Sequence, residues 1–540
     1  MIKVCEEKNE LAIEKKKNRV NNITIVLLIA VLAIGFIAYY MRLTYSALWY
    51  DETIEYFYSK FMSGEVPGGF GTFSMYERIC LTKQPPLYNV LMFFWLKFFD
   101  SEVGFRLAGV ITTLLGAVGL YFGINRIASD KWAAFGTLLY IFTPSVSYYA
   151  LECAEYNLML AAICWTLYFY IRSLQVGTWK SLIGFFLCAT MAAYSQYGSA
   201  FLLVGMFLVM SITFFKDKKL SEIKKMFILT IVVIIVGVVP LIYFFMYKQV
   251  SDSLTIAHIP FFAYGNVFRD FLISVVKQIA WCFTRGAVHD QLSIAILIVA
   301  FGAVILTLIA LFHKNKLLNN IVSVYLISFI LYYFATACNY YGWNSWTSTV
   351  GTKNIGGRYS LFFVPLIMIL LTYGIFIIIT YLKENNIHGY YFLIAIVSLS
   401  FVGYSIAGIW ILHKNWIKDD VRELTKVWYA DNAYNSKTIV HEWDDANFQY
   451  YLIHDYQYKE NYQNNIQAAG YWIRSANDQK MEDGLQELGA FDYDDFYYVA
   501  PKENYNSSYK SFLNVMYNRG YLVTILFEGR SVLLHVTASN

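Results

Sequence analysis

The sequence predicts a multi-span α-helical membrane protein that carries a small α/β domain outside the membrane. Only 15% of the 540 residues are charged and 58% are hydrophobic, whereas soluble domains carry about 25% charged residues. Apolar runs recur between residues 22 and 412, and most approach the ~20 residues that cross a bilayer. Residues 413–540 are polar and contain no such run. The net charge of +4 is too small to indicate a nucleic-acid partner.

Residues 1–21 form a basic N-terminal segment, which includes Lys15, Lys16, Lys17 and Arg19. The apolar run that follows, 22–41, ends in "AYYMRLTY", whose aromatic residues suit the membrane interface. A cleaved signal peptide would have a shorter apolar region and a small-residue cleavage site. We therefore expect an uncleaved first span and a cytoplasmic N-terminus.

About eleven spans are expected within the predicted transmembrane catalytic domain, residues 22–412. They lie near residues 22–41, 104–124, 131–149, 155–171, 181–195, 198–215, 226–247, 291–312, 321–339, 358–382 and 390–412. Short Lys/Arg-rich connections, such as "KDKKLSEIKK" and "HKNKLLNN", alternate with longer or less basic loops. Because basic loops face the cytoplasm, the first loop, 42–103, and the C-terminal segment, 413–540, are expected outside the membrane.

The C-terminal segment has the strand and helix patterns of a small α/β domain. Strands are predicted for "KTIVHEW", "FYYVAP", "YLVTILFEG" and "SVLLHVTA", with the last two joined in a hairpin near "EGR". Helices are predicted for "DANFQYYLIHDY" and "SSYKSFLNVMYNRG". Asp444 and Asp445 are expected to cap the first of these helices, and Gly520 is expected to end the second.

The first external loop contains two amphipathic segments. In "LWYDETIEYFYSKF", residues 48–61, apolar side chains recur at i, i+3, i+4 and i+7 from Ile54, which predicts one apolar helix face. Residues 85–98 form a second apolar stripe behind Pro85 and Pro86, which suit a first helical turn. We expect two helices lying on the bilayer surface. One short span plus a loop is the alternative that these residues leave open.

Ionisable residues gather on the expected outer side of the membrane. The cations are Lys83, Arg106, Lys353 and Arg358, and the carboxylates are Asp51, Glu52, Glu152 and Glu155. Ionisable groups near a membrane core cost free energy, so their presence points to a functional site. The cations suit a lipid-linked phosphate and would stabilise the charge left when a sugar–phosphate bond breaks. A carboxylate would serve as the base for an attacking hydroxyl.

Six segments occur in the order typical of a known family. They are "WYDE", "PPLYNVL", "FRLAGV", "SYYALECAEYNL", "AYSQYGSAFLL" and "GRYSLFFVPL". Over residues 22–410 the chain thereby resembles the GT-C glycosyltransferases, in particular the protein-O-mannosyltransferase and aminoarabinose-transferase type. The resemblance implies a GT-C fold and a sugar donor on a polyprenyl phosphate. It also implies transfer to an extracytoplasmic acceptor hydroxyl, on a cell-envelope glycan, lipid or protein, by a single inverting displacement.

The resemblance assigns roles to the outer residues. Asp51 corresponds to the proposed catalytic base of the family, with Glu52 beside it, and Arg106 to the arginine that contacts the donor phosphate. Lys83, Arg358 and Lys353 are further candidates for that phosphate site. The family often has Lys or His immediately before the Pro-Pro pair, where this sequence has Gln84.

A second departure concerns the family's Glu-x-Arg-x-Tyr pattern. Here Glu152-Cys153-Ala154-Glu155-Tyr156 lacks the arginine and has an extra glutamate. Glu152, Glu155 and Tyr156 are therefore candidates for acceptor binding. The two glutamates are also candidates for a divalent metal of the Mg/Mn type, which some members bind, and no other cofactor is expected.

Two other function classes stay open at this stage. A transporter or lipid flippase would place ionisable groups at the bilayer midplane and often shows two matching halves, and the sequence has neither feature. A non-catalytic membrane scaffold with an external binding domain would explain residues 413–540 but not the clustered acids and bases. The seven cysteines form no CxxC pair, and the histidines lack a ligand spacing, so a zinc cluster is not expected.

Overall fold

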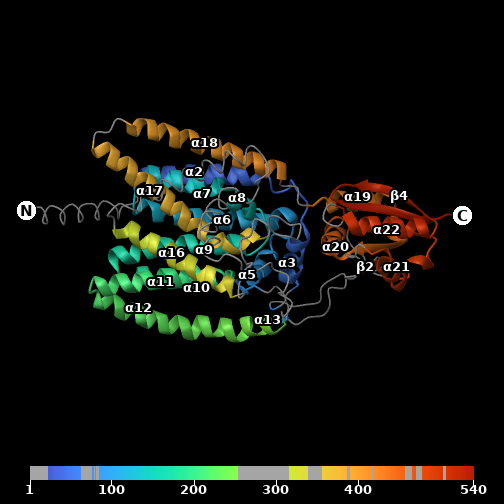
Figure 1. Cartoon of the computed structure of the whole chain (residues 1–540), viewed down its shortest axis with the longest axis horizontal. Helices are drawn as coiled ribbons and strands as arrows, with labels where there is room; N and C mark the ends of the chain where they lie inside the picture. Colours follow the sequence, from blue (N-terminus) through green and yellow to red (C-terminus); the bar gives the residue numbers. More distant parts are fainter. Residues whose placement is uncertain are drawn as a thin grey trace, which may run out of the picture. The chain divides into compact units, whose positions relative to one another are not determined.

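The computed structural model of the chain is drawn in Figure 1. It describes residues 22–61, 76–77, 80, 84–252, 316–338, 356–385, 389–415, 419–456, 465–469, 477–502 and 506–539. The chain forms two compact units. The first consists of Met1–Arg42, Lys83–Tyr88 and Arg106–His413. The second consists of Leu43–Thr82, Asn89–Phe105 and Lys414–Asn540, so it joins most of residues 42–103 to the C-terminal region.

The first unit is a bundle of long apolar helices, several of which run side by side in Figure 1. Its helices are α2 (Asn22–Tyr40), α6 (Glu102–Asn125), α7 (Asp130–Phe142), α8 (Pro144–Ala150), α9 (Tyr156–Val176), α10 (Trp179–Ser195), α11 (Ser199–Lys216), α12 (Leu220–Val233), α13 (Tyr247–Asp252), α16 (Lys316–Ala337), α17 (Val364–Glu384) and α18 (Gly389–Asn415). Among the described residues, eight helices are long and apolar enough to cross a membrane. The predicted multi-span helical fold is therefore confirmed. The expected span 291–312 lies outside the described residues.

The expected span 131–149 is interrupted, and the prediction of one continuous helix is wrong. Its residues form α7 and α8, which meet at Thr143 and Pro144. Proline has no backbone N–H and disfavours the helical conformation in the residue before it. Thr143 accordingly has an extended ψ of 124°.

The expected span 226–247 is helical but irregular. It begins as α12 and continues through two π-helical turns, η1 (Ile234–Val238) and η2 (Leu241–Met246), which lie on either side of Pro240. Proline removes one helical hydrogen bond, and π-helical turns are a common adjustment inside long helices.

Close packing between α6 and α9 depends on glycines. A Cβ atom at Gly109 would lie 2.6 Å from Nδ2 of Asn157 and 2.7 Å from the carbonyl oxygen of Ala150. A Cβ atom at Gly116 would lie 2.7 Å from Cα of Ala161. Small residues permit this close approach of two helices in a membrane. Because both pairs advance in the same chain direction, α6 and α9 run parallel and their N-terminal ends lie together.

Both helices expected within residues 42–103 are present. They are α3 (Tyr50–Lys60) and α5 (Leu87–Trp95). In the second unit, α3 packs against α20 (Glu442–Tyr456) of the C-terminal region. Phe57, which belongs to the apolar face predicted from the sequence, is fully buried. The centre of this face is therefore covered by protein.

A five-stranded sheet forms the C-terminal region, in the order β2-β1-β3-β5-β4. The strands are β1 (Lys437–His441), β2 (Ile466–Ala469), β3 (Asp495–Pro501), β4 (Tyr521–Glu528) and β5 (Ser531–Ala538). β1 pairs in parallel with β2 and β3, and β5 pairs antiparallel with β3 and β4. The expected β4–β5 hairpin is confirmed. The hydrophobic core of the C-terminal region includes the buried Ile439, Phe496, Phe512 and Leu534.

The remaining helices of this region are α19 (Val421–Ala430), α21 (Asp478–Glu487) and α22 (Asn506–Asn518). The sequence predicted α20 and α22 but not α19, α21 or the short strand β2. Gly520 follows α22 with a φ of 75°, as expected for a helix end. The cap prediction for Asp444 and Asp445 is wrong, because β1 leads directly into α20 and both residues lie in its first turn.

Candidate functional site

Asp51 and Glu52 lie in the first turn of α3, in the second unit. Oε2 of Glu52 accepts a hydrogen bond from the backbone N–H of Trp49 at 3.2 Å, and Glu52 is only 1% exposed. This bond satisfies one of the donors that a helix start leaves unpaired. Asp51 is half-buried and lies where the helix dipole favours a negative charge. Glu52 therefore braces the turn, and Asp51 is the more accessible carboxylate.

Tyr56 anchors the middle of α3 within the same unit. Its hydroxyl donates to Oδ1 of Asp100 at 2.7 Å, and Lys60 Nζ lies 2.6 Å from Oδ2 of the same carboxylate. The Tyr56 ring meets the ring of Tyr450 edge-on, with centroids 4.8 Å apart. Burial raises the pKa of Tyr56 above its ordinary value, so its hydroxyl remains a neutral donor. The helix that carries Asp51 is thus held at a fixed rotation.

Arg106 lies near the start of α6, in the first unit, and is fully buried. Gly109, one turn further on the same side of the helix, approaches Ala150 and Asn157. The segment between those two residues contains Glu152 and Glu155, which are 3% and 4% exposed. One buried guanidinium and two buried carboxylates therefore lie at the N-terminal ends of α6 and α9. Buried charges are rarely kept in proteins unless they are paired or functional.

The turn that precedes α9 is fixed by hydrogen bonds. The backbone N–H of Ala154 donates to the carbonyl oxygen of Glu152 at 2.9 Å, and Nδ2 of Asn157 donates to the same oxygen at 3.3 Å. Tyr156, the first residue of α9, is buried, and its ring centroid lies 4.6 Å from that of Tyr149. Asn157 had been given no role from the sequence, although its amide positions the turn.

The other predicted cations are placed less fully. Lys83 and Lys353 lie outside the described residues. Arg358 belongs to the 3₁₀ helix η4 (Gly356–Phe363), which contacts α9 and α11. Within the first unit the structure thus gathers Arg106, Glu152, Glu155 and Tyr156. Asp51 and Glu52 form a second group, in the other unit.

Gln249 is a residue that sequence reasoning missed. It belongs to α13 and is 5% exposed. Its amide nitrogen Nε2 donates to the backbone carbonyl of Gln84 at 2.9 Å, and its Oε1 accepts from the hydroxyl of Tyr197 at 2.7 Å. The residue before the Pro-Pro pair is therefore held by a side chain 165 positions away. No local spacing in the sequence reveals such a contact.

Glu152 and Glu155 do not complete a metal site with other described residues. Across the described part of the chain, no group of three or more His, Cys, Asp or Glu side chains is arranged to hold a metal ion. Mg²⁺ is usually bound by one or two carboxylates together with waters and substrate phosphates. A divalent metal at Glu152 and Glu155 therefore stays a prediction.

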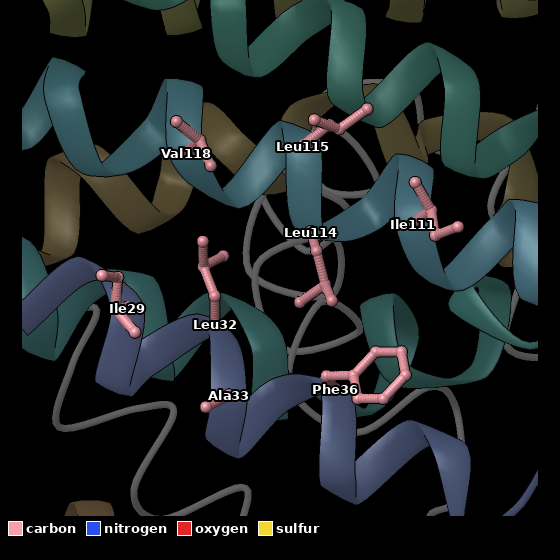
Figure 2. A pocket seen from close by; sticks show the side chains of 8 residues that line it. All are labelled: Ile29, Leu32, Ala33, Phe36, Ile111, Leu114, Leu115 and Val118. Carbon is pink, nitrogen blue, oxygen red and sulfur yellow. The ribbon is translucent and has the colours of Figure 1, made fainter.

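An apolar groove runs between α2 and α6 in the first unit (Figure 2). It has a volume of about 420 Å³ and is lined by Ile29, Leu32, Ala33, Phe36, Ile111, Leu114, Leu115 and Val118. No side chain in this lining carries a charge or a hydrogen-bonding group. Such a groove suits a hydrocarbon chain, because its lining is entirely apolar. It offers no polar group that would bind a headgroup.

Comparisons with known proteins agree with this architecture. Residues 83–244 match the model of the family described as dolichyl-phosphate-mannose-protein mannosyltransferase. The chain superposes on ArnT from Cupriavidus metallidurans bound to undecaprenyl phosphate with a TM-score of 0.52 and 11% identity, covering 94% of this chain and 97% of ArnT. A search of curated proteins gives no match.

An archaeal oligosaccharyltransferase is also similar. The apo form of the enzyme from Archaeoglobus fulgidus matches with a TM-score of 0.48 and 11% identity, over 92% of this chain and 73% of the enzyme. The same enzyme has a structure in complex with Zn and sulfate. The ArnT superposition spans nearly the whole chain, so the chain has the GT-C fold that its motifs predicted.

Proposed function

We propose that the chain is an integral-membrane glycosyltransferase that moves a sugar from a polyprenyl-phosphate donor to an extracytoplasmic acceptor hydroxyl. The observation that carries this proposal is the buried Arg106 beside the segment with Glu152 and Glu155, in a chain with the GT-C fold. A guanidinium binds phosphate oxygens through planar, fixed donors and keeps its charge when buried. The family description and the lipid bound to ArnT support a lipid-phosphate donor.

In the proposed reaction Asp51 is the general base. It takes the proton of the acceptor hydroxyl, whose oxygen attacks the anomeric carbon of the donor sugar. The bond from that carbon to the phosphate oxygen breaks, the configuration inverts, and the electron pair leaves with the lipid phosphate. Arg106 stabilises the charge that develops on this phosphate, together with Arg358, Lys83 and Lys353.

The other candidate residues support this chemistry. Glu52 fixes the first turn of α3 through its bond to the Trp49 amide, which keeps Asp51 in position. Glu152, Glu155 and Tyr156 are assigned to the acceptor, because their turn presents polar groups beside Arg106.

We propose that residues 1–21 are cytoplasmic, that residues 22–412 form the catalytic transmembrane domain, and that residues 413–540 are extracytoplasmic. The short basic connections between spans support this topology. The first external loop, 42–103, would then present Asp51 on the same side of the membrane as the C-terminal region.

A transfer assay with purified protein tests the proposal. The full chain is incubated with a panel of undecaprenyl-phosphate-linked hexoses and pentoses, where water supplies the attacking hydroxyl, and release of undecaprenyl phosphate is followed by mass spectrometry. The native chain is expected to release it from at least one panel member. Asp51→Asn should lower that rate by about 10²- to 10⁴-fold, the usual contribution of a general base, while it still binds undecaprenyl phosphate. The matched control is Asp494→Asn, because Asp494 is an exposed residue of the C-terminal region.

Two results would contradict the assignment. If Asp51→Asn folds, binds the lipid and turns over at the native rate, Asp51 is not the base. If the native chain releases undecaprenyl phosphate from no member of the panel, polyprenyl-phosphate sugars are not its donors.

A further inference from the structure

The backbone that leads into α3 is held by a side chain of the C-terminal region. The backbone N–H of Leu48 donates to the hydroxyl oxygen of Tyr451 at 2.7 Å. Leu48 is fully buried and Tyr451 is 1% exposed. Because a buried N–H is costly to leave unpaired, this single bond is important to the conformation of the segment. Tyr451 belongs to α20, and all these residues belong to the second unit.

The Tyr451 hydroxyl is also a donor, and its acceptor is charged. It donates to Oε2 of Glu102 at 3.0 Å. Arg422 Nη1 donates to both carboxylate oxygens of Glu102, at 3.2 and 3.3 Å. Arg422 Nη2 donates to the backbone carbonyl of Thr44 at 3.2 Å. Tyr451, Glu102 and Arg422 thus form a hydrogen-bonded group that binds both ends of residues 44–48.

The middle of the same segment is bound by hydrogen bonds to the backbone of Asp419. The N–H of Ala47 donates to the carbonyl oxygen of Asp419 at 3.3 Å. The N–H of Asp419 donates to Oγ of Ser46 at 3.3 Å. Residues 44–48 therefore make hydrogen bonds to the C-terminal region at each end and at the centre. Three residues after Leu48, the chain reaches Asp51.

We propose that Tyr451 is a positioning residue for Asp51: by holding the Leu48 amide against Glu102, it sets where α3 begins and where its first carboxylate lies. This inference rests on the proposed function, in which Asp51 is the base. It gives the C-terminal region a part in the reaction through the position of Asp51.

The hydroxyl of Tyr451 is the element that this role requires. It accepts one bond and donates one bond, so a phenylalanine ring of nearly the same shape would lose both. The Leu48 N–H would then be buried without an acceptor, and residues 44–48 would shift to reach another. A displacement of about 1 Å at a reacting group can cost about 10²-fold in rate. Substrate binding elsewhere would be unaffected, so the loss falls on kcat.

The test compares Tyr451→Phe with Tyr497→Phe in the purified full chain. Tyr497 is a matched control, because its hydroxyl donates to Oδ2 of Asp431 at 2.7 Å within the C-terminal region and makes no bond to residues 44–48 that the structure describes. Hydrogen exchange is measured for the peptide that contains Leu48. Turnover is measured with the best donor of the undecaprenyl-phosphate-sugar panel.

Tyr451→Phe is expected to speed exchange at the Leu48 amide about tenfold, in line with the loss of one buried hydrogen bond. It should lower kcat about 10- to 100-fold with little change in the KM for the donor. Tyr497→Phe should change neither quantity. Unchanged exchange at Leu48 would overturn the proposal, and so would faster exchange with an unchanged kcat.

The two arms also separate this proposal from the proposed function. A native chain that uses no donor of the panel contradicts the proposed donor class and, with it, the part of Tyr451 in that reaction. A native chain that is active, combined with a Tyr451→Phe variant of native kcat, contradicts only the positioning role.

Discussion

The phenol oxygen of Tyr56 and Nε2 of His454 lie 2.9 Å apart, which joins α3 to α20. The Tyr56 hydroxyl has one proton and donates it to Asp100. His454 is therefore the donor to Tyr56, as a neutral ring with its proton on Nε2. Burial lowers the pKa of His454, whereas Asp100 and Asp455 raise it and Lys60 lowers it, and the net shift is downward.

Acid should therefore loosen the contact between α3 and α20. Since the folded-state pKa of His454 lies below its ordinary value of about 6.5, its stabilisation is complete above that pH and is lost as the pH falls through the folded-state value. Hydrogen exchange in α3 should become faster from about pH 7 to about pH 5.5, after correction for the intrinsic rate. His454→Gln should flatten this dependence, because glutamine keeps a donor but does not titrate.

The control for this prediction is His535→Gln. His535 is a partly exposed histidine that lies near Asp495. It belongs to β5, which is far from α3 in the sequence. Its variant should keep the native pH dependence. If His454→Gln also keeps it, another group is responsible.

A second pH effect, of opposite sign, is expected from Asp419 and Asp444. Burial raises the pKa of Asp419 to about 7 and raises that of Asp444 well above its ordinary value, where Asp419 adds to the shift. The amide Nδ2 of Asn447 donates to Oδ2 of Asp419 at 2.6 Å. Nearby, Asp420 accepts from the backbone N–H groups of Arg530 and Ser531. Asp419 and Asp444 are thus two buried acids beside the side-chain amide of Asn447.

The C-terminal region should be less stable at about pH 8 than at about pH 6. The folded state holds a proton on Asp419 that the unfolded chain has already lost, so this stabilisation is present at low pH and is lost as the pH rises through about 7. Asp419→Asn should remove much of this dependence and stabilise the region at pH 8, by on the order of 4 kcal/mol at most. Hydrogen exchange in β1 measures the change.

The exposed Asp494→Asn variant serves again as the control. It should leave the pH dependence of β1 exchange as it is in the native chain. An Asp419→Asn variant that is equally pH-sensitive would show that Asp419 does not carry the proton that the folded state holds.

Much of the architecture could be predicted from the sequence, because it depends on local periodicity. The apolar runs predicted the eight described helices that are long enough to cross a membrane, and the spacing from Ile54 predicted α3 almost to the residue. The alternating strands gave the hairpin of β4 and β5. The break at Pro144 could have been found from the proline alone, since the residue before it rarely stays helical.

The contacts that position the candidate site could not be predicted in this way. Leu48 and Tyr451 are 403 residues apart. The chain has 46 tyrosines, and no sequence pattern identifies which of them contacts Leu48. The role of Glu52 was likewise open, because a carboxylate at a helix start can brace the turn or act on a substrate. Its bond to the Trp49 amide identifies the bracing role. The catalytic assignment of Asp51 remains a prediction.

Arg106→Lys should weaken binding of the donor phosphate. Lysine keeps the charge but loses the planar pair of donors, which is worth about 1.5–3 kcal/mol at a charged acceptor. The dissociation constant for undecaprenyl phosphate, measured by native mass spectrometry, should rise about tenfold or more. Arg172→Lys is the control, because Arg172 lies on α9 and bonds Tyr168. A folded Arg106→Lys protein with native affinity would remove Arg106 from the phosphate site.

Gly109→Ala should disturb the ends of α6 and α9 where the proposed phosphate and acceptor groups meet. The added Cβ would lie 2.6 Å from the Asn157 amide nitrogen and 2.7 Å from the Ala150 carbonyl oxygen, so the turn with Glu152 must move. Overpacking of this kind costs about 1–3 kcal/mol.

Gly123→Ala is the matched control on the same helix, because its Cβ would meet its nearest neighbour, Cα of Tyr168, at an ordinary 3.7 Å. Alanine is the better helix former by about 1 kcal/mol, so this variant should be as stable as the native chain or more so. Thermal unfolding in detergent and turnover of the best panel donor are measured for both. Gly109→Ala should lower Tm and reduce turnover more than the small loss of folded protein explains, because the polar turn is displaced. An unchanged Tm together with native turnover would mean that α6 and α9 can separate slightly without harm, and that the close approach at Gly109 does not set the geometry of the site.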